Sequence, residues 1–182
     1  VGYTVSHLYA WQVPSASGLL AIYLIVGLGL VGAADDYLKI FKQRSTGIRA
    51  RTKLIGQAFV ALTFSYGTTL WPDEYGRTPA SNAVSLVRDT PIVLPTALLL
   101  LWIWLLITAS TNAVNLTDGL DGLAAGASAI TFMAYTLLGV WQYGQNCAFG
   151  RFVRCYDVRD PLDLAVVAAA MAGACVGFLW WN

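Results

Sequence analysis

The chain of 182 residues is 57% hydrophobic and only 12% charged, with a formal net charge of +1. Soluble domains usually carry about 25% charged residues, so this composition excludes an ordinary soluble domain and favours a polytopic membrane protein. The chain starts without Met and stops after "GFLWWN". We therefore expect a piece of a longer protein, incomplete at both ends and without a cleaved signal peptide.

Five apolar stretches are long enough to cross a membrane as helices, since about 20 residues at about 1.5 Å each span the hydrocarbon core. They cover residues 15–34, 54–71, 92–111, 123–143 and 164–181. Tryptophans near several of their ends are typical of an aromatic belt. The sequence predicts an all-α fold, with a single transmembrane domain over residues 1–182. Residues 1–13 fit either an outer loop or the end of another helix.

The loop after the first span is strongly basic. It contains six Lys and Arg residues and no acid, namely Lys39, Lys42, Arg44, Arg49, Arg51 and Lys53. The other long loops, residues 72–91 and 144–163, mix five arginines with six acids. Lys and Arg close to span ends favour the cytoplasmic side, so we expect the basic loop to be cytoplasmic. Attraction to anionic lipid is a second use for the same charges.

Counting crossings from that loop brings three polar groups to the same face. Asp35 and Asp36 end the first span there. The third span returns with the central polar segment "NAVNLTDGLDGLA" (residues 112–124), and the fifth returns with Asn182. Charged groups at membrane depth are costly and are rarely placed there for structure alone. We therefore predict one site on the cytoplasmic rim.

The residue types in these groups suit phosphate and metal chemistry. Asp35 and Asp36 are adjacent, so on a helix their side chains point about 100° apart and can address two partners. Side-chain oxygens suit Mg²⁺ held together with substrate phosphates, and Lys39 and Lys53 could hold phosphate as point charges. In the central segment, polar side chains recur every three residues and neighbours share a helical face: Asn112, Asn115, Asp118 and Asp121. Helix capping is the alternative use for them.

A glycine pattern in the first span, Gly27, Gly29 and Gly32, matches the dinucleotide fingerprint G-x-G-x-x-G. We reject that interpretation because the glycines lie inside an apolar span rather than between a strand and a helix. Small residues in such a span favour close helix packing instead.

The cysteines differ in their expected surroundings. Cys147 and Cys155 fall in a predicted outer loop, where disulfides persist, and we predict that they pair; two free thiols are the alternative. Cys175 lies in the fifth span and is expected to pack there, and His7 is assigned no role.

Four segments resemble one family of bacterial membrane enzymes: "VGAADDYLK", "ARTKLIGQ", "NAVNLTDGLDGLA" and the terminal "GFLWWN". They look like the phospho-N-acetylmuramoyl-pentapeptide transferases, which belong to the polyprenyl-phosphate N-acetylhexosamine-1-phosphate transferases. The resemblance runs from about Ser15 to the last residue, and "DDYLK" together with "NLTDGLDGL" is its most specific part. It implies a fold of about ten spans, of which this chain would hold roughly half.

The resemblance implies a reaction. Phospho-MurNAc-pentapeptide would move from UDP-MurNAc-pentapeptide to undecaprenyl phosphate with Mg²⁺, giving lipid I and UMP, the first membrane step of peptidoglycan synthesis. The site would face the cytoplasm at the bacterial plasma membrane. The partners would be these two substrates and membrane lipid, without nucleic acid, and a homodimer is left open. A further family Asp and a His-rich loop would lie beyond residue 182, so we expect residues 1–182 alone to be inactive.

The candidate site residues follow from the resemblance and the spacing together. The catalytic candidates are Asp35, Asp36 and Asp118. The substrate-binding candidates are Lys39, Lys53, Asn112, Asp121 and Asn182. Asn115 is the candidate near the metal, together with the family Asp beyond residue 182.

The charge of a lipid phosphate bears on the role of the two adjacent aspartates. The second pKa of a phosphate monoester is about 6, so a lipid phosphate is largely ionised at neutral pH and offers a base little to remove. Asp35 and Asp36 are therefore expected mainly to organise metal and substrate, with proton abstraction as the alternative.

Three other functions stay open from the sequence. A sister enzyme that uses UDP-GlcNAc would share the paired aspartates, although its central motif should differ. An ion-coupled transporter would place ionisable groups near the middle of the membrane, whereas these spans carry none inside. An inactive scaffold is the third alternative.

Overall fold

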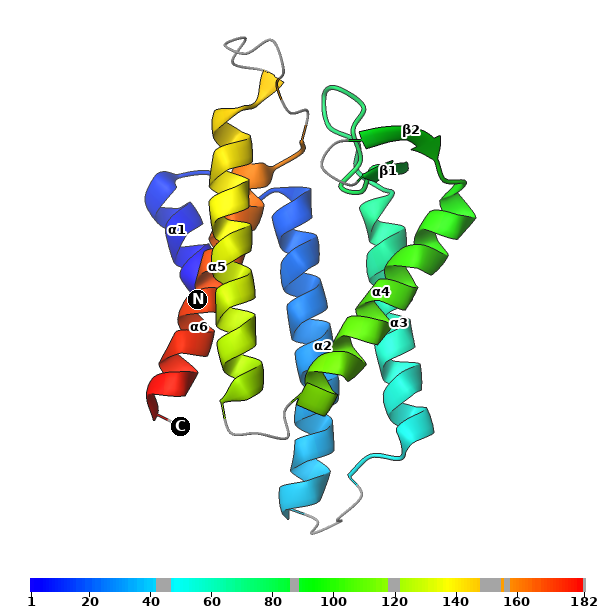
Figure 1. The fold of residues 1–182 in the computed structure, drawn as a ribbon, viewed down its shortest axis with the longest axis vertical. Coiled ribbons are helices and arrows are strands. Elements are labelled where there is room, and N and C mark those ends of the chain that lie inside the picture. The colour runs from blue at the N-terminus through cyan, green and yellow to red at the C-terminus, as the bar shows by residue number, and fades with distance from the viewer. Residues whose placement is uncertain (42–46, 86–88, 118–121, 148–154, 156–157, 182) are drawn as a thin grey trace. The chain divides into compact units, whose positions relative to one another are not determined.

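The structure, a computed structural model, describes residues 1–41, 47–85, 89–117, 122–147, 155 and 158–181. In this part of the chain the elements are, in order, α1 (Gly2–Ala10), α2 (Ala16–Phe41), α3 (Ala50–Thr68), β1 (Ala83–Ser85), β2 (Asp89–Val93), α4 (Thr96–Thr117), α5 (Leu123–Gly144) and α6 (Pro161–Trp181) (Figure 1). Contacts divide the chain into two compact units: Val1–Leu19 with Thr111–Asn182 forms unit 1, and Leu20–Ser110 forms unit 2. The single domain over residues 1–182 stays a prediction.

The predicted all-α membrane fold is confirmed. Among the described residues, four helices are long and apolar enough to cross a membrane: α2, α4, α5 and α6. Only 6% to 22% of the most apolar window of each helix is buried within the chain. Apolar helices that bury so little of themselves in protein are suited to contact with lipid tails. The chain is therefore part of a multi-pass membrane protein.

The second predicted span coincides in part with α3, which is not among those four helices. Its first turn carries Arg51 and Lys53, and Gln57 follows one turn later, so its mean hydropathy is lower. The membrane crossing of α3 stays a prediction.

Helix α2 continues beyond the predicted end of the first span. It runs to Phe41, so Asp35, Asp36 and Lys39 are all helical. An ion pair between Lys39 and Asp35, four residues apart, supports this last part of the helix. The aspartates therefore project from a continuous helix rather than from a loop.

A β-hairpin precedes α4, and this hairpin was not predicted from the sequence. β1 and β2 are antiparallel, with Ala83 opposite Val93 and Ser85 opposite Asp89. Part of the predicted third span, residues 92–93, is thus strand. β-branched residues favour a strand here. Pro95 has no backbone N–H and is tolerated at the start of a helix but not inside one, so α4 begins only after it. The Pro95 carbonyl accepts the first helical hydrogen bond, from the Leu99 N–H at 3.0 Å.

In unit 1, α5 packs along α6 through small residues (Figure 1). A Cβ at Gly139 would lie 2.7 Å from the Pro161 carbonyl oxygen and 2.9 Å from the Ala165 Cβ. The short helix α1 rests on the same α6, where a Cβ at Gly2 would lie 3.3 Å from the Ala170 Cβ. Backbones approach this closely only where side chains are small.

In unit 2, one glycine of the rejected dinucleotide pattern explains a close approach of α2 to α3. A Cβ at Gly27 would lie 2.7 Å from a methyl carbon of Val60, whereas Cβ atoms at Gly29 and Gly32 would meet nothing within 4 Å. The Tyr23 and Thr63 hydroxyls also form a hydrogen bond of 2.6 Å between the two helices. The packing role predicted for the glycines is thus confirmed for Gly27 alone.

Candidate active site

The two adjacent aspartates near the end of α2 differ sharply in exposure. Asp35 is 6% exposed, whereas the Asp36 side chain is 70% exposed. Successive residues on a helix point about 100° apart, so one carboxylate turns toward the following loop and the other toward solvent. The sequence predicted two directions, and the structure shows which residue takes each.

Asp35 is held from three sides. Its Oδ2 lies 2.7 Å from the Lys39 Nζ and 4.0 Å from the Lys53 Nζ. Its Oδ1 accepts a hydrogen bond of 2.8 Å from the backbone N–H of Ile48. Lys39 and Lys53, predicted separately to bind phosphate, therefore meet on one carboxylate. Within the described part of the chain, Asp36 makes a longer contact, 3.9 Å from its Oδ1 to the Lys39 Nζ.

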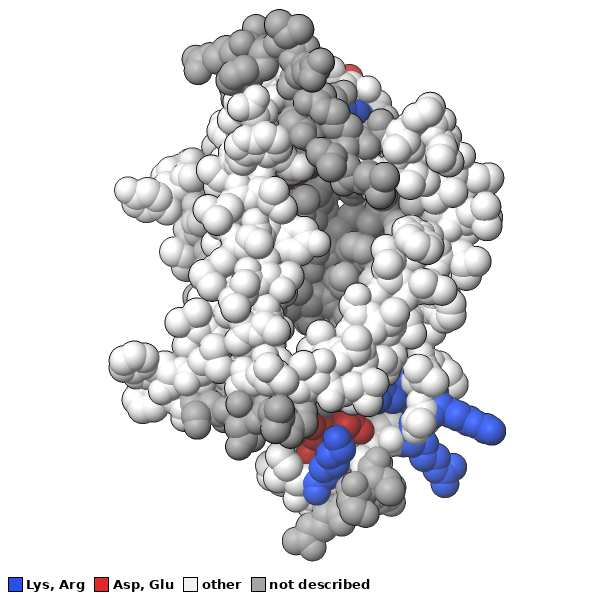
Figure 2. Space-filling model, viewed as in Figure 1, with Lys and Arg blue, Asp and Glu red and all other residues white. Residues whose placement is uncertain are grey.

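Basic side chains surround this pair. Figure 2 shows the blue side chains gathered beside a small red area on the visible face. Lys39 and Lys53 contact Asp35, and Arg49 and Arg51, both exposed, lie next in sequence after Ile48, which bonds to the same carboxylate. Four cations against two carboxylates leave an excess of positive charge, which attracts anionic groups such as phosphates.

Asn112 and Asn115 belong to the last two turns of α4, so the helix includes the start of the central polar segment. Asn112 is half-buried and Asn115 is exposed. Their spacing of three residues puts both on one side of the helix, as predicted. The N-cap of α5 is Gly122, at φ 75°, and glycine has no side chain to cap the helix. The capping alternative for the polar segment stays open, because Asp118 and Asp121 lie outside the described residues.

Three predicted site residues, Asp118, Asp121 and Asn182, lie outside the described residues. The paired aspartates belong to unit 2, and Asn112 and Asn115 belong to unit 1. The convergence of these groups on one rim stays a prediction.

The donor atoms fit a magnesium ion chemically. No group of three or more His, Cys, Asp or Glu side chains that could hold a metal occurs among the described residues. Mg²⁺ seldom needs such a cage, because it usually takes one or two carboxylates and completes its shell with water and substrate phosphates. The exposed carboxylate of Asp36 and the exposed carboxamide of Asn115 are hard oxygen donors of this kind.

Residues 18–182 match a family model described as Glycosyl transferase family 4. The chain belongs to this family. It is 54% identical over its whole length to a relative from Cutibacterium acnes, covering 52% of that relative. It is 53% identical to one from a Nocardioides species and 50% identical to one from Thermobifida fusca, again covering 52% of each. All three are named phospho-N-acetylmuramoyl-pentapeptide-transferase, which confirms the resemblance, and the chain spans about half the length of the curated relatives it matches.

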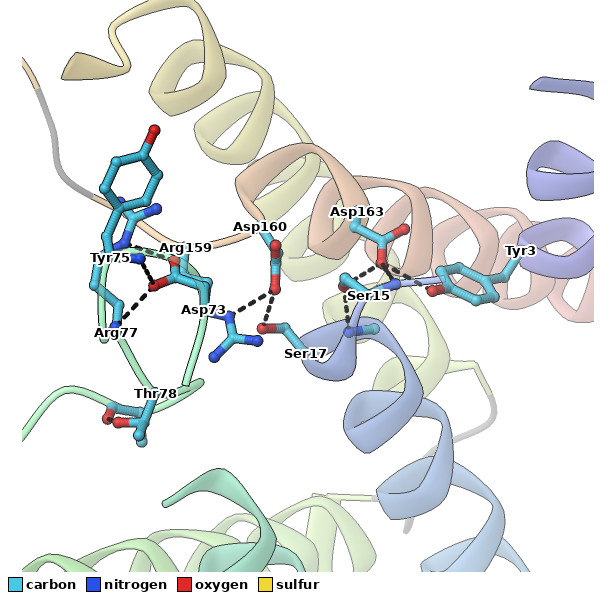
Figure 3. Close-up of polar contacts among 12 residues, drawn as sticks. Tyr3, Ser15, Ser17, Asp73, Tyr75, Arg77, Thr78, Arg159, Asp160 and Asp163 are labelled. Atoms are coloured by element: carbon cyan, nitrogen blue, oxygen red, sulfur yellow. Dashed lines mark hydrogen bonds and ion pairs between the residues drawn. The ribbon is translucent and has the colours of Figure 1, made fainter. Parts of the chain in front are cut away.

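The family motifs gave no sign of a second polar cluster, centred on Asp163 in the first turn of α6 (Figure 3). Its carboxylate accepts hydrogen bonds from the Tyr3 hydroxyl at 2.8 Å, from the Ser15 N–H at 3.1 Å and from the Ser15 hydroxyl. The His7 Nε2 lies 2.6 Å from its other oxygen. Burial and the adjacent carboxylate raise the pKa of Tyr3 well above its usual range. His7, left without a role by the sequence, therefore belongs to a structural cluster.

Nearby, the Ser17 hydroxyl donates to Asp160 at 2.6 Å, and the Arg159 Nε lies 3.2 Å from the same carboxylate (Figure 3). Together the two carboxylates tie the first turn of α2 to the start of α6.

The predicted disulfide between Cys147 and Cys155 is confirmed. The two residues are bonded, with their Cα atoms 4.8 Å apart. Among the described residues Cys175 is the free cysteine, and it is half-buried in α6.

Proposed function

We propose that this chain is part of an enzyme that transfers phospho-MurNAc-pentapeptide from UDP-MurNAc-pentapeptide to undecaprenyl phosphate, giving lipid I and UMP. The names of the relatives and the family of the chain support this activity. The observation that carries it is the aspartate pair at the end of an apolar helix. One carboxylate is exposed beside an excess of cations.

The proposed reaction exchanges one phosphate–oxygen bond for another. A lipid phosphate oxygen bonds to the phosphorus that carries the sugar, and the bond from that phosphorus to the UMP oxygen breaks. All the reacting groups are anionic, so the chief task of the protein is to position them and offset their charge. Lys39, Lys53 and their arginine neighbours suit that task. An apolar helix that ends in this group suits a substrate whose phosphate lies at the membrane surface.

We further propose that Mg²⁺ takes part, held by Asn115 together with the family Asp beyond residue 182, and that Asp36 helps to organise the ion and the substrate. When bound, the ion would neutralise charge on the phosphates. The proposed site lies on the cytoplasmic face of the bacterial plasma membrane, because the basic loop next to it is the densest cluster of Lys and Arg in the chain.

The test uses the full-length protein in nanodiscs with Mg²⁺, with and without undecaprenyl phosphate. UMP release is measured from UDP-MurNAc-pentapeptide and from UDP-GlcNAc, with a chelator as the metal control. We expect lipid-dependent, chelator-sensitive release from the first nucleotide alone. Release from UDP-GlcNAc alone would assign the protein to the sister activity. Release from neither would contradict the proposal.

A further inference from the structure

The loop between α2 and α3 approaches Asp35 with its backbone. Gly47 is buried and has φ +58°, a left-handed conformation that favours glycine. A Cβ at Gly47 would collide with Asp35 Oδ1 and would lie 3.1 Å from the Asp35 Cγ and 2.8 Å from the Lys39 Cε. The next residue, Ile48, donates its N–H to the same Oδ1 at 2.8 Å. The backbone at Gly47 and Ile48 thus approaches the buried carboxylate to a distance that only glycine permits.

We propose that Gly47 and the backbone N–H of Ile48 are positioning elements for phosphoryl transfer, which lock Asp35 into its ion pair with Lys39 and leave Asp36 to meet the substrate. This inference rests on the proposed function. It divides the aspartate pair into a carboxylate that holds the loop and a lysine in place, and a carboxylate that faces the reacting groups.

The division follows from how many donors each carboxylate has. Asp35 has a lysine and a backbone N–H at hydrogen-bonding distance, and both its oxygens are engaged. Rotation of its side chain would leave a buried carboxylate without these partners, which is unfavourable. Asp36 is 70% exposed, and its contact with Lys39 in the described part of the chain is 3.9 Å long, so its oxygens are accessible to a ligand. Because Lys39 is tied to Asp35, the loop also fixes the position of a cation in the site.

The experiment compares two glycine substitutions in the full-length protein. Gly47→Ala places a methyl group against Asp35 and Lys39. Gly76→Ala is the matched control, because Gly76 has φ +76° and nothing within 4 Å of a Cβ. Both variants carry the strain of a left-handed alanine, and only the first disturbs the aspartate pair. The measurements are thermal unfolding, kcat per folded enzyme and KM for both substrates.

We expect Gly47→Ala to lower kcat by about 10- to 100-fold, the scale of a catalytic group displaced by about 1 Å. Gly76→Ala should keep kcat within about twofold of wild type while losing a similar amount of thermal stability. Equal kcat values in the two variants would overturn the positioning role. UMP release absent from the wild type would instead contradict the proposed function.

A second pair of variants tests the positioning role if Gly47→Ala does not fold. Ile48→Pro removes the N–H that Asp35 accepts, and Ile48→Ala retains it. We expect kcat of the proline variant to fall at least about tenfold below that of the alanine variant. Similar kcat values in these two folded variants would overturn the role of the Ile48 N–H.

Discussion

At the scale of single residues, the aspartate pair is two groups with different surroundings. Two adjacent carboxylates in a motif would be expected to share one role. In the structure, Asp35 is buried against Lys39 and Ile48, whereas Asp36 is exposed. Helical geometry alone separates their directions. Which of them is buried depends on the loop that follows, since that loop supplies the N–H donor.

Asp36→Asn in the full-length protein tests whether the exposed carboxylate organises ligands or removes a proton. We expect kcat to fall by about 100-fold or more, and to stay low as the pH is raised, because the lipid phosphate is already ionised near neutral pH. The measurement is a pH–rate profile of UMP release from pH 6 to about 10.

The control for that profile is Glu74→Gln, which removes an exposed carboxylate in another loop of the chain. It should reproduce the wild-type profile. Recovery of Asp36→Asn toward wild-type rates at high pH would contradict the organising role and favour a general base.

At the scale of the elements, one polar junction joins helix ends. The carboxylate of Asp163, in the first turn of α6, accepts hydrogen bonds from Tyr3 in α1 and from Ser15 just before α2. An acidic residue near a helix N-terminus is also favoured by the helix dipole. Two N-terminal segments are therefore joined to a helix 148 or more residues later at one carboxylate.

Tyr3→Phe tests that junction by removing one donor to Asp163. A hydrogen bond to a charged group contributes about 1.5–3 kcal/mol, so we expect a clear fall in the apparent Tm at neutral pH. Since the folded-state pKa of Tyr3 is raised above its usual value near 10, this contribution is present below about pH 10. It is lost as the pH rises through the raised pKa.

The difference in Tm between wild type and Tyr3→Phe should therefore shrink only in strongly alkaline solution. The matched control is Tyr9→Phe in the same helix, where the side chain is 89% exposed, and its Tm should equal that of wild type. Equal Tm values for Tyr3→Phe and Tyr9→Phe would contradict the structural role of the junction.

At the scale of the whole molecule, the membrane orientation determines which side the proposed site faces. The disulfide between Cys147 and Cys155 and the basic loop after α2 should lie on opposite sides. Disulfides persist outside the cytoplasm, whereas Lys and Arg near span ends favour the cytoplasmic side. The two observations are independent, and from both we predict that the basic loop faces the cytoplasm.

Thiol labelling in intact cells measures this orientation. After mild reduction we expect a membrane-impermeant reagent to label Cys147 and Cys155, and to label Arg51→Cys only after the cells are opened. Cys175, half-buried in α6, is the internal control for access and should label slowly in both cases. Labelling of Arg51→Cys in intact cells would reverse the orientation, and two free thiols in protein from its native membrane would contradict the disulfide.

Some of the fold followed directly from the sequence, because long apolar runs can cross a membrane only as helices or closed barrels. The helices α2, α4, α5 and α6 are recognisable as such runs in the sequence. Their bounds were less predictable: α2 continues to Phe41 and α4 to Thr117, since polar residues are compatible with a helix. The hairpin of β1 and β2 was missed because its strands are short and run directly into the following apolar stretch.

The sequence by itself determined the family, the membrane class and the residue types of the candidate site, since these depend on composition and local motifs. Only the tertiary structure decided that Asp35 is buried and Asp36 exposed, that Gly47 closes over Asp35, and that His7 and Tyr3 meet Asp163. The physical reason is that burial and hydrogen bonding depend on groups brought together from distant positions, up to 160 residues apart for Tyr3 and Asp163. Local sequence patterns carry no record of such partners.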